Sequence, residues 1–79
     1  MSDYEPIACA QHDRFEAAIL HRQPLRARWW DASGERHEGI LLPLDLLVEA
    51  GAEYLVARGG RGQSLRLRLD RIQLSGPGA

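Results

Sequence analysis

The sequence predicts a mainly β fold with one N-terminal α-helix and a small five-stranded β-barrel. The chain has 79 residues, which is enough for a single domain. Helical spacing of apolar residues occurs only near the N-terminus, and short strand-like segments separated by glycine-containing turns fill the remainder. Closing such short strands into a barrel removes the exposed edges of the sheet, so we expect the barrel over residues 25–74.

The helix is predicted over residues 10–22 (AQHDRFEAAILHR), which include good helix formers and contain neither glycine nor proline. Phe15, Ala18 and Ile19 share one face at i, i+3 and i+4, so this apolar stripe should pack on the sheet. Pro24 follows directly and ends the helix.

Two strands joined by a hairpin should follow the helix. Residues 25–31 (LRARWWD) alternate between two faces, and residues 35–41 (ERHEGIL) return after a turn at residues 32–34. Gly34 supplies the permissive backbone position of that turn. Gly39 lies inside the second strand and predicts a bulge or sharp bend there.

The middle of the chain is less clear. Residues 42–51 (LPLDLLVEAG) are ambiguous, because Pro43 can open a short helical turn that Gly51 closes. Residues 53–58 (EYLVAR) are predicted as the third strand.

The last part of the chain predicts two further strands. Residues 59–62 (GGRG) form a turn, and residues 64–69 (SLRLRL) are the clearest strand, with three leucines facing the core. Residues 70–74 can form a short fifth strand. We expect residues 1–75 to be one domain and residues 76–79 to be a flexible tail.

Charge is distributed unevenly along the chain. The 10 basic and 11 acidic residues give a net charge of -1, so direct binding to nucleic acid is not expected, because nucleic-acid-binding domains are normally basic. Residues 1–57 hold ten acids and five arginines, whereas residues 58–79 hold one acid and five arginines. The domain therefore offers one acidic and one basic surface to partners.

Nothing in the sequence indicates a membrane or secreted protein. Cys9 is the only cysteine, so no internal disulfide can form. No apolar run approaches the roughly 18 residues of a membrane span. The first ten residues carry two acids and no basic residue, which is the wrong charge for a secretory signal. We therefore expect a cytoplasmic protein.

The residue types that carry catalysis form no clear motif. Cys9, His12 and His21 lack the second pair of ligands that a zinc site requires. Cys9 with His12 is a weak nucleophile–base pair, and we expect Cys9 to be a small buried residue. Residues 59–62 resemble a phosphate loop but do not open a helix. We predict no enzyme activity, no cofactor and no metal.

Four arginines form one candidate binding surface. Arg26 and Arg28 project from one predicted strand and Arg66 and Arg68 from another, and with Trp30 they make a candidate RNA-binding patch. The alternative, which we favour, is a solvated sheet face whose arginine stems cover apolar surface and pair with acids across strands.

Two acids form a second candidate surface. Asp13 and Glu16 lie three residues apart near the start of the predicted helix, away from its apolar stripe, so they share a solvent face. Carboxylates there complement the positive end of the helix dipole, and they also present an acidic surface to a basic partner.

Three segments carry a family resemblance that covers residues 4 to 74. They are Tyr4-x-Pro6-Ile7-x-Cys9-x-x-His12-Asp13-x-Phe15-Glu16, Glu53-Tyr54-Leu55 and Leu67-Arg68-Leu69-Asp70-x-Ile72. Together they resemble the Rho-binding antiterminator family. The first segment is the most specific, because its proline, cysteine and acidic pair keep their spacing together. His12 stands where the family has tyrosine, and Phe15 where it has leucine.

The resemblance implies an Sm-like (SH3-like) five-stranded barrel behind one helix, in a bacterial protein. It also implies a non-enzymatic antiterminator that binds transcription termination factor Rho at the RNA-binding surface of its N-terminal OB-fold domain and blocks RNA loading. The residues that match the family's Rho contacts are His12, Asp13, Glu16, Glu49 and Gly51. Two alternatives stay open, an Sm-like RNA-binding module that uses the four arginines and a small structural or assembly subunit.

Overall fold

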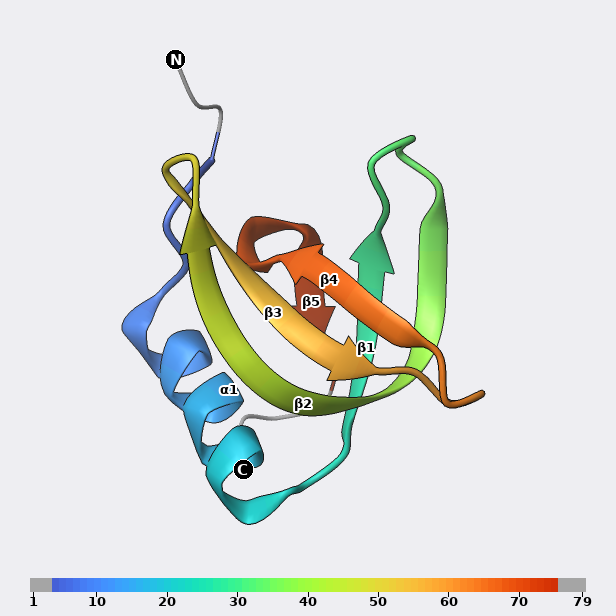
Figure 1. Ribbon diagram of the computed structural model, residues 1–79. Coiled ribbons are helices and arrows are strands. Elements are labelled where there is room, and N and C mark those ends of the chain that lie inside the picture. Colours follow the sequence, from blue (N-terminus) through green and yellow to red (C-terminus); the bar gives the residue numbers. More distant parts are fainter. Residues whose placement is uncertain (1–3, 76–79) are drawn as a thin grey trace.

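The computed structural model describes residues 4–75, which form one α-helix followed by five strands (Figure 1). The predicted tail at residues 76–79 lies outside these residues. The elements are α1 (Cys9–His21), β1 (Leu25–Trp30), β2 (Arg36–Glu49), β3 (Ala52–Arg58), β4 (Ser64–Arg68), the 3₁₀ helix η1 (Leu69–Arg71) and β5 (Ile72–Leu74). The predicted fold class, mainly β with one N-terminal helix, is confirmed.

The five strands form one antiparallel sheet in the order β4-β3-β2-β1-β5. The long strand β2 is shared: its first half pairs with β1 and its second half pairs with β3. Figure 1 shows β2 curving from the β1–β2 turn to the β2–β3 turn. Among the described residues no strand pairing joins β4 to β5, so the sheet is not closed by hydrogen bonds and the closed barrel stays a prediction.

The structure resolves the ambiguous segment and corrects one prediction for β2. Residues 42–49 are extended backbone of β2, and the possible helical turn between Pro43 and Gly51 does not form. The predicted bulge at Gly39 is absent, since Gly39 pairs in register with Ala27. The register shifts instead between Pro43 and Asp45. A proline lacks the N–H that a ladder needs, so the irregularity falls where the chain cannot make a regular bond.

The core lies between α1 and the curved sheet. Phe15 and Ala18 of α1 are buried and Ile19 is partly buried, as the predicted stripe requires. The buried cluster around Phe15 includes Leu41 of β2 and Leu55 of β3, both almost fully buried. The remaining members of this cluster are Ala27, Trp29, Ala57, Leu67, Leu69 and Ile72.

The helix α1 has 13 residues, whereas a membrane-spanning helix needs about 20. Within residues 4–75, no helix has the length and apolar character needed to cross a bilayer.

A tight turn connects β2 to β3. Ala50 and Gly51 both have positive φ angles, 53° and 81°. Positive φ at both central residues is the pattern of the type I′ hairpin turn, for which asparagine followed by glycine is preferred. Alanine at the first position is strained, because its Cβ approaches the following carbonyl oxygen in the left-handed region.

We therefore expect Ala50→Asn to raise the free energy of unfolding by about 0.5–1 kcal/mol, because asparagine tolerates the left-handed conformation better than alanine. Urea denaturation of the two proteins measures the difference. Gly51→Ala is the control with the opposite sign, since it introduces a Cβ at positive φ. An Ala50→Asn protein no more stable than the parent would contradict the assigned turn.

Candidate functional site

The exposed side of α1 carries the acidic residues that the sequence singled out. Asp13 and Glu16 are both exposed, and His12 beside them is partly buried. The His12 ring bridges two carboxylates: Nδ1 lies 3.0 Å from Glu16 Oε1, and Nε2 lies 3.1 Å from Glu53 Oε2 on β3. We call His12, Glu16 and Glu53 the bridging cluster. It connects the exposed side of α1 to the sheet.

The protonation of His12 follows from this geometry. Both ring nitrogens can donate hydrogen bonds only when the imidazole is protonated. The hydrogen bonds to Glu53 and Glu16 raise the pKa of His12 above its ordinary value, and they outweigh the effect of partial burial, which lowers it. When His12 is protonated, the bridging cluster holds one positive charge between two negative ones, with the carboxylate of Asp13 beside it.

Glu49 and Gly51 lie at the β2–β3 turn. Both are exposed, and Gly51 is the second left-handed residue of that turn. The Glu49 carboxylate accepts a hydrogen bond from the guanidinium of Arg66 on β4. Glu53 follows the turn closely and contacts His12, so the turn lies near the N-terminal half of α1. The predicted contact residues are thus brought to neighbouring parts of the structure.

The four arginines of the candidate RNA-binding patch have different surroundings. Arg28 of β1 lies opposite Glu38 of β2 in the ladder, and their side chains pair at 3.6 Å. This is the cross-strand pairing that the alternative interpretation expects. Arg26 is exposed on the same strand. Arg66 and Arg68 of β4 instead line a separate hollow that neither β1 arginine reaches.

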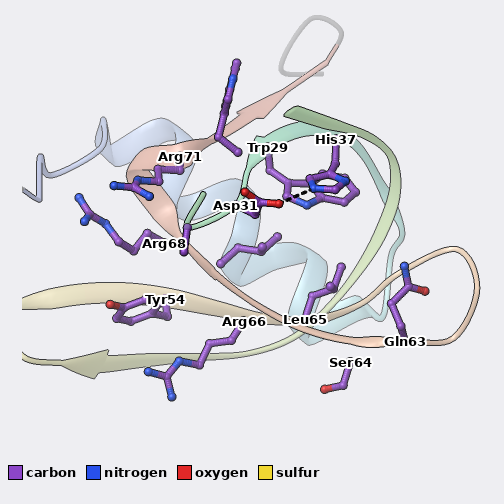
Figure 2. Close-up of a pocket in the computed structure, with 13 residues that line it drawn as sticks. Trp29, Asp31, His37, Tyr54, Gln63, Ser64, Leu65, Arg66, Arg68 and Arg71 are labelled. Atoms are coloured by element: carbon purple, nitrogen blue, oxygen red, sulfur yellow. Dashed lines mark hydrogen bonds and ion pairs between the residues drawn. The ribbon is translucent and has the colours of Figure 1, made fainter. Parts of the chain in front are cut away.

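That hollow has a volume of about 680 Å³ and combines arginines with aromatic rings (Figure 2). The guanidinium carbon of Arg66 lies 4.8 Å from the ring centroid of Tyr54, a cation–π distance. The rings of Trp29 and His37 stack at 5.9 Å. The lining also includes Trp30, Asp31, Ala32, Gln63, Ser64, Leu65, Leu67, Arg68 and Arg71. We call this the arginine–aromatic hollow.

Arg68 in the hollow is held by Asp70. Its Nε lies 3.0 Å from Asp70 Oδ1 and its Nη2 lies 2.5 Å from Asp70 Oδ2. Burial raises the pKa of Asp70, but the hydrogen bonds from Arg68 and from the Glu5 N–H outweigh it, so the pKa is lowered overall. Asp70 therefore stays ionised, and its charge offsets that of Arg68.

Glu53 and Tyr54 were not predicted as site residues, but the structure places them in the bridging cluster and in the arginine–aromatic hollow. Glu53 is placed in the bridging cluster by a contact across 41 residues of sequence. Tyr54 is placed in the hollow because it lies opposite Arg68 in the β3–β4 ladder. Both belong to the Glu53-Tyr54-Leu55 segment, so the family resemblance was the one available signal.

The expectation that Cys9 is buried is wrong. Cys9 is exposed at the first position of α1. It lies six residues before Phe15, so its side chain points about 120° away from that of Phe15 around the helix axis. The exposed Cys9 thiol therefore has no enclosed setting.

Two groups of side chains in the described region have potential metal-ligand atoms within 4.8 Å of one another. They are His12, Asp13 and Glu16, and Asp31, Glu35 and His37. Hydrogen bonds account for the close approach of His12 to Glu16 and of His37 to Asp31. Asp31 also accepts the backbone N–H groups of Ser33 and Glu35, so it holds the β1–β2 turn.

The raised pKa of His12 predicts a stability that depends on pH. The bridging cluster stabilises the folded state fully when the pH is below the pKa of His12 in the unfolded chain, which is about 6.5. This contribution to the free energy of unfolding is lost as the pH rises through the higher pKa of His12 in the folded protein. We expect His12→Gln to lower the free energy of unfolding most near pH about 6, with the loss shrinking toward pH about 9. Denaturant titrations across this range measure it. The exposed His21→Gln is the control, and a His12→Gln effect independent of pH would refute the bridge.

Comparison with known proteins places the fold in a family. None of the curated proteins compared with this chain is significantly similar to it. Among solved structures, Proteasome accessory factor B/C (PafBC) of Arthrobacter aurescens has a similar fold, with a TM-score of 0.64 and 24% sequence identity. The similarity covers 95% of this chain and 13% of PafBC, so this chain spans a small part of that protein's length. The sequence model of the WYL domain matches residues 11–74, and this chain belongs to the WYL domain family.

Proposed function

We propose that this chain is a non-enzymatic antiterminator that binds transcription termination factor Rho. It would occupy the RNA-binding surface of the N-terminal OB-fold domain of Rho, block RNA loading and so reduce Rho-dependent termination. The observation that carries the proposal is the acidic side of α1, where Asp13 and Glu16 are exposed at the positions that match the Rho-binding antiterminator family. A closed Sm-like barrel and a cytoplasmic setting belong to the same proposal.

The negative charge of the exposed side of α1 supports binding to the RNA-binding surface of Rho. Surfaces that bind single-stranded RNA are positively charged grooves, so carboxylates compete with RNA phosphates for them. His12 holds Glu16 in one orientation and ties it to Glu53 of β3, which reduces the ordering cost of binding. Opposite charges would also steer the encounter, so association should slow as salt rises.

The β2–β3 turn adds a second region to the proposed contact. Glu49 and Gly51 match the second contact region of the family, and the left-handed pair at residues 50 and 51 keeps the turn short. The comparisons with the WYL domain and PafBC do not name Rho, and they are compatible with a small regulatory domain.

We expect Asp13→Asn with Glu16→Gln to weaken binding to the Rho hexamer by about tenfold at low salt and to reduce the salt dependence. Displacement of a labelled C-rich RNA from Rho measures the effect. Glu35→Gln with Glu38→Gln is the matched control, since it removes the same charge at the β1–β2 hairpin, away from α1 (Figure 1). If the RNA stays bound to Rho at a saturating concentration of the parent protein, the proposed function is wrong. If the Asp13/Glu16 variant displaces the RNA as well as the parent does, the acidic-helix mechanism is wrong.

The arginine–aromatic hollow favours a second candidate function, direct binding of single-stranded RNA. A guanidinium over the Tyr54 ring beside two further arginines combines the charge and the stacking surface that such RNA requires. Arg66 and Arg68 already pair with Glu49 and Asp70, so their positive charge is partly offset. This is why we rank the function second.

If RNA binds the arginine–aromatic hollow, Tyr54→Leu should weaken the affinity for RNA by roughly tenfold or more, because a base loses its stacking partner. Fluorescence anisotropy of a labelled oligonucleotide without Rho, measured over a range of salt, tests this. The affinity should fall steeply with salt. Asp13→Asn with Glu16→Gln is the control and should not weaken RNA binding. No binding of RNA to the parent protein at low salt would eliminate this candidate.

A further inference from the structure

An apolar groove runs between α1 and β2, beside the acidic residues. It has a volume of about 450 Å³, and its walls are Ala17, Ile19 and Leu20 of α1 and Leu46 of β2. Glu16 and Asp45 stand on its rim. We call it the α1–β2 groove.

Leu20 is an exposed apolar residue in the lining of this groove. Its side chain is 77% exposed, the largest exposure among the large apolar residues described as exposed. Leu20 lies four residues after Glu16, so the two side chains are neighbours on the helix surface. An apolar side chain and a carboxylate therefore face solvent side by side, and the side chain of Leu20 lies outside the buried core.

This pairing matches the chemistry of single-stranded RNA. An RNA strand offers phosphates and flat apolar bases, and proteins that bind it combine basic side chains with aromatic rings that stack on the bases. A protein that competes for such a surface with carboxylates alone would leave the aromatic rings uncovered. The α1–β2 groove supplies the apolar component next to Glu16, and both acids on its rim complement a basic surrounding.

We infer that the α1–β2 groove receives an aromatic side chain of the RNA-binding surface of Rho, while Glu16 and Asp45 pair with basic side chains around it. This inference rests on the proposed function and names a second part of the same interface. The antiterminator then substitutes for bases as well as for phosphates.

The experiment separates the apolar contribution from the ionic one. Leu20→Gln keeps the length and helix propensity of the side chain but removes its apolar character. Ile40→Thr is the matched control, because Ile40 is 41% exposed on β2 and does not line the groove. Leu20→Met is the conservative variant. Affinity for the Rho hexamer is measured at low and high salt, with circular dichroism to check the fold.

We expect Leu20→Gln to weaken binding by about tenfold at both salt concentrations, leaving the salt dependence unchanged, since burial of apolar surface is not screened by salt. Leu20→Met and Ile40→Thr should bind like the parent. If Leu20→Gln binds Rho like the parent, the inference about the α1–β2 groove is wrong and the acidic-helix function is unaffected. No binding of Rho by the parent protein would overturn both. Dimerisation of the parent in sedimentation, abolished by Leu20→Gln, would assign the groove to a second copy of the chain and also overturn the inference.

Discussion

Burial of the Phe15 ring between α1 and the sheet is the contact on which the rest of the structure depends. Phe15 is fully buried in a cluster with residues from the strands and from η1, and the single cysteine leaves no covalent alternative. This contact fixes the rotation of α1 about its axis. Asp13 and Glu16 consequently face solvent, His12 contacts Glu53 of β3, and Leu20 lines the α1–β2 groove.

Continuity of β2 is the second constraint. One strand of 14 residues pairs with β1 and then with β3, so it carries both halves of the sheet and also contributes Leu46 to the groove beside α1. The register shift after Pro43 accommodates the curvature. Because β2 ends in a two-residue turn, β3 starts immediately beside it and brings Glu53 to His12.

Features with a local cause could be predicted from the sequence. The helix, the buried stripe of Phe15 and Ala18, and the inward leucines of β4 follow from spacing alone. The course of β2 could not be predicted, because Pro43 is compatible with a helix start as well as with a bulge, and only pairing on both sides decides between them. Spacing also placed Asp13 and Glu16 correctly on one exposed surface. Glu53 joined them through a contact that no local pattern encodes.

The ion pair between Glu49 and Arg66 makes the two candidate surfaces energetically interdependent. Glu49 belongs to the turn beside the acidic surface, and Arg66 belongs to the arginine–aromatic hollow. An anion that takes the Arg66 guanidinium would release the Glu49 carboxylate, and a basic partner that takes Glu49 would release Arg66. Linkage requires each event to favour the other by the same factor. If both proposed ligands bind, this one exposed ion pair would compete with each of them, and the cost of breaking it would be shared by the two binding events.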